Sequence, residues 1–223
     1  MTMDNNGIPI PTIKRLPSYL RLLKVYREEG LEMVSATTLA EELGLKPIQV
    51  RKDISCTGIE GKPKVGFAVP ALIDAIIETL GWDNATDAIL VGAGYLGSAL
   101  VRYEGFANYG LKILAAFDVD QSKWGATIGS VPVYSIEEMG KYIQENHVNI
   151  AVLTVPADQA QAAADMVVKH GIRAIWNFAP KDLKLDSEVV LQRTDLATSF
   201  AVLSAQVKMR LDQKKRKANT VTW

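Results

Sequence analysis

The chain has 223 residues, 48% of them hydrophobic and 22% charged, and its 25 basic residues balance its 25 acidic ones. This composition is ordinary for a globular protein of two domains, and a net charge of zero argues against a partner held by overall charge alone. Because the start lacks the basic and apolar regions of a signal peptide, no apolar run approaches the roughly 20 residues that span a bilayer, and the single cysteine, Cys56, excludes an internal disulfide, we expect a cytoplasmic protein without a membrane segment.

The first third of the chain predicts three short helices. Residues 1–13 contain prolines and little periodicity, which is typical of a loose arm. The first helix is expected to begin at Pro17, because proline is tolerated in the first turn, and to end at Gly30. The second helix is expected to have Thr37 or Thr38 as its N-cap.

The second and third helices form a helix-turn-helix pattern. Gly44 ends the second helix and Pro47 opens the third after a short turn. On the third helix, the apolar side chains are expected to face the core; these are Ile48, Val50 and Ile54.

The outward face of the third helix carries Gln49, Arg51 and Lys52, which can contact base edges or phosphates. The glycine-punctuated stretch after it reads as a hairpin-like wing with Lys62 and Lys64 near its tip. The same pattern is typical of a small helical domain with a solvated basic face, so the residues alone leave DNA binding as one of two interpretations.

The boundary between the domains is expected after residue 81. An apolar helical pattern covers residues 69–80, Gly81 ends it, and a polar stretch follows. We therefore expect one domain at 1–81, a second at 82–194, and a separate C-terminal helix with a basic tail at 195–223.

A glycine-rich turn opens the second domain. A short apolar run at 88–91 precedes Gly92, Gly94 and Gly97, which have the G-x-G-x-x-G spacing, and an apolar helical pattern follows. In a dinucleotide-binding turn, the first glycine makes the bend, the second lets a pyrophosphate approach the backbone, and the third lets the helix pack on the strand. A turn with a purely structural role can have the same spacing. The next strand therefore has to decide between a dinucleotide-binding turn and a structural one.

That next strand, expected at 111–118, ends in a carboxylate. Asp118 follows Gly97 by about 20 residues, the spacing at which an acid accepts hydrogen bonds from the adenosine ribose and repels a 2′-phosphate. The two features together favour binding of NAD over NADP. Taken alone, Asp118 could be a solvated strand end.

The rest of the domain alternates strands and helices. Strands are expected at 131–134, 148–155 and 172–178, with helices at 136–145 and 158–170. Alternation of this kind predicts a parallel sheet covered on both faces, with ligand loops at the carboxyl ends of the strands. Loops 92–97, 154–157 and 177–180 are thus expected to line one crevice.

A final helix is expected at residues 195–209. Leu196, Phe200, Leu203 and Val207 form one apolar stripe along it, and such a stripe needs more covering than a chain terminus usually offers. The pattern favours packing into a second subunit.

Several strings in this order resemble the Rex family, the redox-sensing transcriptional repressors that respond to the NADH/NAD ratio. The resemblance extends over nearly the whole chain, and its most specific strings are Tyr19-Leu20-Arg21, Gln49-Val50-Arg51-Lys52-Asp53-Ile54-Ser55, the glycine turn, Phe117-Asp118-Val119-Asp120, Leu153-Thr154-Val155-Pro156-Ala157, Asn177-Phe178-Ala179-Pro180 and Thr194-Asp195-Leu196-Ala197. It implies an α/β fold in which a Rossmann-like parallel sheet follows an all-α winged helix-turn-helix domain. It further implies a homodimer in which the C-terminal helix is exchanged between subunits.

The resemblance also implies roles for individual residues. Gln49, Arg51 and Lys52 match positions that contact an A·T-rich palindromic operator, and Lys62 and Lys64 lie in the wing. The cofactors implied are NAD and NADH, and the residues expected around them are Gly92, Ala93, Gly94, Tyr95, Leu96, Gly97, Tyr103, Asp118, Lys123, Thr154, Val155, Pro156, Asn177, Phe178 and Asp195.

Three of the matched residues are implied to act as a switch. In the family, an aspartate on the exchanged helix, here Asp195, pairs with an arginine of the DNA-binding domain, here Arg21, when NAD is bound. With NADH it turns toward a tyrosine, here Tyr103. Oxidised nicotinamide is cationic and reduced nicotinamide is neutral, so a nearby carboxylate can respond to the difference.

The chain departs from the family pattern in its DNA-binding half. Cys56 and Thr57 stand where the family has an aromatic pair, and the wing string Glu60-Gly61-Lys62-Pro63-Lys64 has no arginine. Lysine lacks the planar fork that suits a narrow A·T minor groove. A relative that binds NAD(H) but has weakened or redirected DNA binding therefore remains an alternative.

An NAD-dependent oxidoreductase is the enzyme alternative. It would need an acid or base near the nicotinamide, but His147 and His170 lie at predicted helix ends, and no Tyr-x-x-x-Lys pair accompanies the turn. The sequence also has no Cys/His cluster for a catalytic metal. We therefore expect a repressor without catalytic or metal-binding residues.

Overall fold

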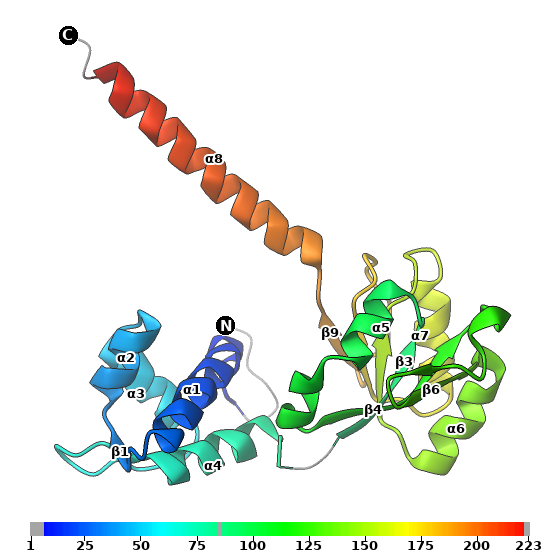
Figure 1. Ribbon diagram of the computed structural model, residues 1–223, viewed down its shortest axis with the longest axis horizontal. Coiled ribbons are helices and arrows are strands. Elements are labelled where there is room, and N and C mark those ends of the chain that lie inside the picture. The colour runs from blue at the N-terminus through cyan, green and yellow to red at the C-terminus, as the bar shows by residue number, and fades with distance from the viewer. Residues whose placement is uncertain (1–6, 84–85, 221–223) are drawn as a thin grey trace. The chain divides into compact units, whose positions relative to one another are not determined.

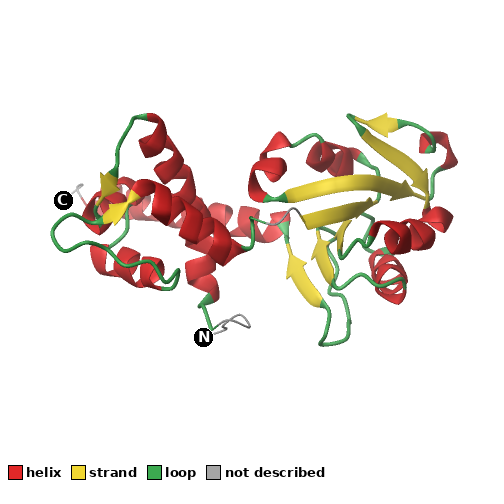
Figure 2. Cartoon of the chain, turned by 90° about the horizontal axis from the view of Figure 1, so that it is seen from below, coloured by secondary structure: helices red, strands yellow, loops and turns green. Residues whose placement is uncertain are grey.

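The computed structural model describes residues 7–83 and 86–220 (Figure 1). The chain divides into two units, residues Met1–Ala85 and Thr86–Trp223, each with its own hydrophobic core. The first unit is mainly helical and the second is built on a parallel sheet, as Figure 2 shows by colour.

Four helices make up most of the first unit: α1 (Ile10–Glu28), α2 (Ala36–Leu43), α3 (Pro47–Ser55) and α4 (Val69–Leu80). In the described part of this unit, strands β1 (Met33–Val34) and β2 (Phe67–Ala68) pair antiparallel, and β2 directly follows the predicted wing. The expectation of an all-helical domain is therefore wrong in this detail. The core gathers fully buried side chains from all four helices, among them Leu20, Leu39, Ile54 and Ile73.

Helix α1 begins earlier than the sequence predicts, so residues 10–13 are not part of a loose arm; residues 1–6 of that arm lie outside the described residues. Pro11 lies in the first turn, and Pro17 lies inside the helix. The turns before Pro17 are held by Thr12 and Arg15, whose side chains bond to Asp53 of α3. This tertiary contact thus stabilises the helical turns that precede Pro17, although local propensity predicts that the helix begins at Pro17.

The helix-turn-helix differs from its prediction at two positions. Ser35, rather than Thr37 or Thr38, caps α2, because its hydroxyl accepts a hydrogen bond from the backbone N–H of Thr38 at 3.0 Å. Ile48 is 62% exposed instead of buried. It precedes the buried Val50 by two residues, which places it about 200° around the helix.

In the described part of the second unit, seven strands form one sheet in the order β5-β6-β4-β3-β7-β8-β9. They are β3 (Thr86–Val91), β4 (Leu111–Asp118), β5 (Thr127–Ile128), β6 (Val131–Ser135), β7 (Ile150–Leu153), β8 (Ala174–Asn177) and β9 (Val190–Arg193). All neighbours are parallel except β5 and β6. The parallel strands, taken in chain order, follow the 3-2-1-4-5-6 arrangement of a Rossmann-like sheet, whose order reverses between β3 and β7.

Helices cover both faces of this sheet. Ile89 and Val91 of β3 pack on one face with residues of α6 (Met139–Asn146) and α7 (Ala160–Lys169), while Ala88 and Leu90 pack on the other face. Helix α5 (Tyr95–Val101) contributes to the second face, and three short 3-10 helices complete the connections: η1 (Glu104–Tyr109), η2 (Gln121–Lys123) and η3 (Ile136–Glu138). The carboxyl ends of β3, β4 and β7 meet where the strand order reverses, which is where a ligand-binding site is expected in such a sheet.

Strands β7 and β8 are shorter than predicted. Val148 and Ile172 are apolar and buried with α6 and α7, but they lie outside the paired residues. An apolar run indicates that its residues are buried, not that they pair with a neighbouring strand. The predicted strand ranges therefore extend too far.

Helix α8 (Leu196–Thr220) continues beyond the predicted end at residue 209, and residues 221–223 of the basic tail lie outside the described part. The described side chains of α8 are exposed, including Phe200 at 69%. Among the described residues, we find no helix with the length and apolar character that crossing a membrane requires.

Candidate functional site

The glycine turn between β3 and α5 has two tight positions and one open position. Gly92 has a φ of +98°, and a Cβ there would lie 2.9 Å from the carbonyl carbon of Thr154. A Cβ at Gly97 would collide with the carbonyl oxygen of Gly92. At Gly94, by contrast, no described atom outside its neighbours would come within 4 Å. The backbone at Gly94 is thus accessible to a ligand, while the other two glycines hold the strand and helix together.

Asp118, at the carboxyl end of β4, is connected to this turn. Its Oδ2 accepts a hydrogen bond from the backbone N–H of Ala93 at 2.8 Å, and its Oδ1 accepts one from Asp120 N at 2.9 Å. The side chain is buried. The carboxylate is therefore fixed between two loops, and Oδ1 keeps a lone pair for a further donor.

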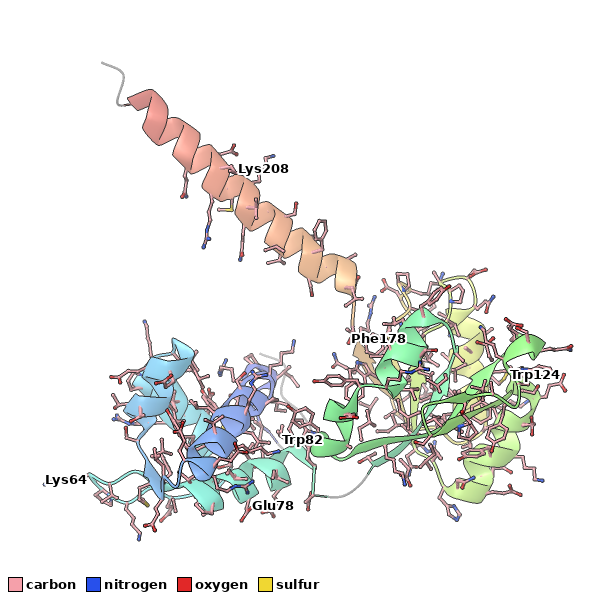
Figure 3. The ribbon with its side chains drawn as sticks, in the orientation of Figure 1. Lys64, Glu78, Trp82, Trp124, Phe178 and Lys208 are labelled. Atoms are coloured by element: carbon pink, nitrogen blue, oxygen red, sulfur yellow. The ribbon has the colours of Figure 1, made fainter. Side chains whose placement is uncertain are left out.

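Lys123 and Trp124 both contact Asp118, Lys123 at its carboxylate and Trp124 at its backbone. Lys123 Nζ lies 2.9 Å from Asp118 Oδ2 and 3.7 Å from Asp120 Oδ2. The hydrogen bond to Asp118 raises the pKa of Lys123 above its ordinary value, so the amine stays protonated. Trp124, labelled in Figure 3, donates its ring N–H to the backbone oxygen of Asp118 at 2.8 Å.

Asp118, Lys123 and part of the glycine turn line a cavity of about 740 Å³ at the carboxyl ends of β3, β4 and β7. The predicted residues that line it are Gly92, Gly94, Asp118, Lys123, Thr154, Val155 and Pro156. Sequence reasoning missed Asp120, Asp158, Gln159 and Met166, which also line it. Their positions just after a strand or on the following helix are the signal that could have found them, since ligands in such sheets bind beside the loops after the strands.

Thr154 connects the end of β7 to the glycine turn. Its hydroxyl donates a hydrogen bond to Gly92 O at 2.7 Å, and its backbone N–H donates to Val91 O at 2.9 Å. The same hydroxyl would lie 2.8 Å from a Cβ at Gly97. Thr154 therefore fixes the geometry of the turn as well as lining the cavity.

Asn177 and Asp195 line a second cavity of about 380 Å³ together with Arg193 and Thr194. The Asn177 amide is buried and committed to the loop after β8, since Nδ2 donates to Ala179 O at 3.2 Å and Oδ1 accepts from Ala179 N at 3.0 Å. Asn177 thus shapes the loop after β8 and also lines this cavity.

A chain of aromatic rings runs from Tyr103 to Phe178. The Tyr103 and Phe106 ring centroids are 4.9 Å apart, those of Phe106 and Trp176 are 5.4 Å apart, and those of Trp176 and Phe178 are 4.8 Å apart. Trp176 also donates its ring N–H to Thr194 Oγ1 at 2.8 Å. Tyr103 is thereby linked through packing to the residue that precedes Asp195. Figure 3 labels Phe178 at the end of this chain.

The three expected switch residues each have local partners. Asp195 accepts hydrogen bonds from Ala197 N at 2.9 Å and Thr198 Oγ1 at 2.8 Å at the start of α8, and the bond from Thr198 lowers the pKa of Asp195. Arg21 Nη2 lies 3.5 Å from Ser18 Oγ. Tyr103 packs on Phe106 within the second unit.

The polar face of α3 contains an unexpected buried carboxylate. Arg51 and Lys52 are exposed, whereas Gln49 is half-buried and donates its Nε2 to Asp53 Oδ1 at 3.0 Å. Asp53 is fully buried and also bonds to Arg15, at 2.6 Å between Nε and Oδ2. Sequence reasoning missed Asp53. Asp53 shares a helix face with Val50 and Ile54. An acidic residue at a position where the helical period predicts a buried apolar side chain is the signal that could have found it.

The predicted wing is a tight hairpin. Lys62 and Gly66 exchange backbone hydrogen bonds of 2.7 and 2.9 Å, and Lys64 has a φ of +63° at the tip, where Figure 3 shows it. Arg51, Lys62 and Lys64 line a cavity of about 370 Å³ between the wing and α2. At the end of α3, Cys56 donates its thiol to Lys52 O at 3.3 Å, and Thr57 donates its hydroxyl to Ile54 O at 2.7 Å.

The described residues contain no group of three or more histidine, cysteine, aspartate or glutamate side chains that could hold a metal ion. His147 and His170 lie at the C-terminal ends of α6 and α7. The His170 ring packs where a Cβ of Gly140 would lie. Both histidines are thus accounted for by helix ends and packing.

Two family models match the chain. Residues 7–55 match a model described as a putative DNA-binding protein N-terminus, and residues 83–181 match a CoA binding domain model. Among curated relatives, a redox-sensing transcriptional repressor Rex of Treponema denticola is 47% identical over 197 residues, which cover 88% of this chain and 94% of that protein. One of the same name from Bacteroides fragilis is 40% identical over 90% of this chain and 91% of that protein.

Solved structures give a similar result. A crystal structure of RSP in complex with beta-NAD+ and operator DNA has a TM-score of 0.87 and 33% identity, covering 96% of this chain and 99% of that one. A structure of RSP in complex with beta-NADH has a TM-score of 0.83 and 32% identity, covering 93% of this chain and 98% of that one. The similarity therefore includes both the helical unit and the sheet unit.

Proposed function

This chain belongs to the Rex family of redox-sensing transcriptional repressors, and we propose that it binds operator DNA with NAD and releases it when NADH replaces NAD. The observation that carries the proposal is the combination, in one chain 47% identical to a Rex repressor, of a dinucleotide cleft and a helix-turn-helix with a wing. By its family, the protein is a transcriptional repressor and not an enzyme.

We propose that the cleft at the carboxyl ends of β3, β4 and β7 holds the dinucleotide. The open backbone at Gly94 would receive the pyrophosphate, and Asp118 would accept a hydrogen bond from the adenosine ribose with its remaining lone pair. Thr154, Val155 and Pro156 would line the path toward the nicotinamide. The oxidised nicotinamide supplies a positive charge that the reduced ring lacks.

The switch residues are proposed to act between subunits. Asp195 caps the first turn of α8, so its carboxylate has partners that a competing arginine or tyrosine must displace. We propose that Arg21 takes this carboxylate in the NAD state and Tyr103 takes it in the NADH state. The aromatic contacts from Tyr103 to Trp176, and the bond from Trp176 to Thr194, support communication between the cofactor and Asp195.

The homodimer is also part of the proposal. The apolar stripe of α8 is exposed in the single chain, at Leu196, Phe200, Leu203, Val207 and Leu211. Exposed stripes of this kind are typical of helices covered by a second subunit. Exchange of α8 between subunits would cover it.

The test is fluorescence anisotropy of a labelled A·T-rich inverted-repeat duplex, titrated with the protein at one stated salt concentration without cofactor, with NAD and with NADH. We expect binding that survives NAD and is lost with NADH. Equal binding to a scrambled duplex in all three conditions would contradict the proposal. It would favour an NAD(H)-binding relative whose DNA contacts are altered, as the lysine wing and the Cys56-Thr57 pair suggest.

A further inference from the structure

We propose that Asp53 is a positioning residue for recognition of the operator sequence. It holds the side-chain amide of Gln49 so that one hydrogen-bond donor and one acceptor of that amide face the major groove as a pair. Such a pair matches the N7 acceptor and N6 donor of adenine. The inference rests on the proposed operator binding and adds a residue that acts through Gln49.

The Asp53 carboxylate is saturated by donors from two helices. Its Oδ1 accepts from Thr12 Oγ1 at 2.9 Å, Arg15 Nη2 at 2.7 Å and Gln49 Nε2 at 3.0 Å. Its Oδ2 accepts from Arg15 Nε at 2.6 Å and Tyr19 OH at 2.7 Å. Because Thr12, Arg15 and Tyr19 belong to α1, the position of the carboxylate is set from outside α3, the helix that carries Gln49.

The charge of Asp53 decides which end of the Gln49 amide faces it. Burial on its own would raise the pKa of Asp53, but the hydrogen bonds from Arg15, Tyr19, Thr12 and Gln49 keep that pKa below its ordinary value. An ionised carboxylate only accepts hydrogen bonds. The amide oxygen of Gln49 would be repelled by it, so the NH₂ group must face Asp53 and Oε1 must face away.

The remaining groups of Gln49 then form a defined pattern. Its NH₂ group has two hydrogens, and Asp53 uses one. One N–H and Oε1 remain on a side chain that is only half-buried. Adenine offers an acceptor and a donor to this pair, whereas guanine offers two acceptors. The tether also reduces the rotamer freedom that a glutamine would otherwise lose on binding.

The first experiment uses the wild-type chain and an operator in which each adenine is replaced in turn by 7-deazaadenine, which pairs normally but lacks N7. We expect one position in each half-site at which the replacement weakens binding about tenfold, measured by anisotropy in the presence of NAD. Gln49→Ala should bind the normal and substituted operators equally. Specific binding with no sensitive position, or the same loss in Gln49→Ala, would overturn the inference alone.

The second experiment separates positioning from structural support. In Asp53→Asn, the ratio of affinities for the normal and 7-deaza operators should fall from about 10 toward 1. Thr12→Val is the matched control, because it removes another donor to the same carboxylate while Arg15 and Tyr19 still hold that carboxylate in place, so the ratio should be kept. A purely structural Asp53 would weaken binding to both operators equally and leave the ratio unchanged.

A third measurement does not depend on the folding of the Asp53 variant. In the free full chain, the side-chain amide protons of Gln49 should give NMR signals with unequal exchange rates, one of them protected by Asp53. Equal and fast exchange would show that the tether is absent and overturn the inference. Failure of the wild type to prefer any operator over scrambled DNA would overturn the proposed function together with this one.

Discussion

Two buried carboxylates, Asp53 and Asp118, are each held by several donors, and their surroundings assign them different roles. Asp53 bonds to α1 through Arg15, whose side chain is 28% exposed, and it does not line any of the three cavities described above. Asp118 faces the cleft and bonds to loop backbone and to Lys123. The first therefore joins helices, and the second is available to a ligand.

The role of Asp53 predicts acid sensitivity of the helical unit. Its folded pKa is lowered, so its stabilisation is fully present above the unfolded value of about 4 and is lost as the pH falls through the folded pKa. Asp53→Asn should cost on the order of 3 kcal/mol at pH 7, because Arg15 then loses its charged partner. Urea unfolding followed by circular dichroism at pH 7, 5, 4 and 3 measures both effects. If wild type and variant lost stability in parallel between pH 5 and 3, the assignment would be wrong.

Asp118 and Lys123 predict how the cleft discriminates between NADH and NADPH. Asp118→Ser should weaken NADH binding about tenfold, through loss of a charge-assisted hydrogen bond. It should also narrow the preference for NADH over NADPH, because Lys123 loses its closest carboxylate and becomes available to a 2′-phosphate. Calorimetric titration with both cofactors gives the two affinities.

The control for Lys123 is the double variant Asp118→Ser, Lys123→Ala. It should bind NADPH less well than Asp118→Ser alone. An unchanged NADPH affinity would mean that Lys123 does not meet the phosphate.

At the scale of elements, the strand-turn-helix unit β3–α5 separates two roles of glycine. Gly97→Ala should destabilise the sheet unit by about 2 kcal/mol or more, since the added methyl collides with Gly92 and Thr154. Gly94→Ala should leave stability within about 0.5 kcal/mol, because its φ of −80° is ordinary and the space around it is open. It should nevertheless weaken NADH binding, since the methyl group occupies the approach to the backbone.

Thermal unfolding and NADH titration of the two variants measure this separation. The interpretation of the turn fails if Gly94→Ala binds NADH as the wild type does while remaining fully folded. A shift of melting temperature by NADH in the wild type gives the reference, since a ligand that binds only the folded state raises stability.

The elements show which parts of the fold a sequence can predict. The predicted ranges 111–118 and 69–80 coincide with β4 and α4, because a strand in the middle of the sheet forms a continuous apolar run and α4 ends at a left-handed Gly81. The start of α1 and the exposure of Ile48 were not predictable in this way. The start of α1 depends on Asp53, which contacts Arg15 across 38 residues of sequence, and no local pattern contains that pairing. The exposure of Ile48 follows instead from its position about 200° around α3 from the buried Val50.

The candidate site divides in the same manner. The glycine turn and Asp118 follow from spacing, since the roles of these residues are set by their place at the end of a strand. Lining residues on α7, such as Met166, and the commitment of the Asn177 amide to its own loop depend on side-chain contacts. Those contacts are established only when the strands are assembled into a sheet.

At the scale of the whole molecule, the exposed apolar stripe of α8 predicts the assembly. Leu203→Glu places a charge in the middle of the stripe and should convert the proposed dimer to a monomer at micromolar concentration, because a buried, unpaired carboxylate is costly. Ala205→Glu is the matched control, since residue 205 lies about 180° from the stripe on an ideal helix and should leave the dimer intact. Sedimentation velocity distinguishes the two states.

The same pair of variants connects assembly with regulation. A palindromic operator offers two half-sites, so a monomeric Leu203→Glu protein should lose most of its affinity for the inverted repeat, while its cleft should still bind NADH, because Gly94, Asp118 and Thr154 all come from one chain. Ala205→Glu should retain both activities. A wild-type chain that sediments as a monomer would contradict the exchanged helix. If Leu203→Glu remained dimeric, the dimer interface would have to lie outside this stripe.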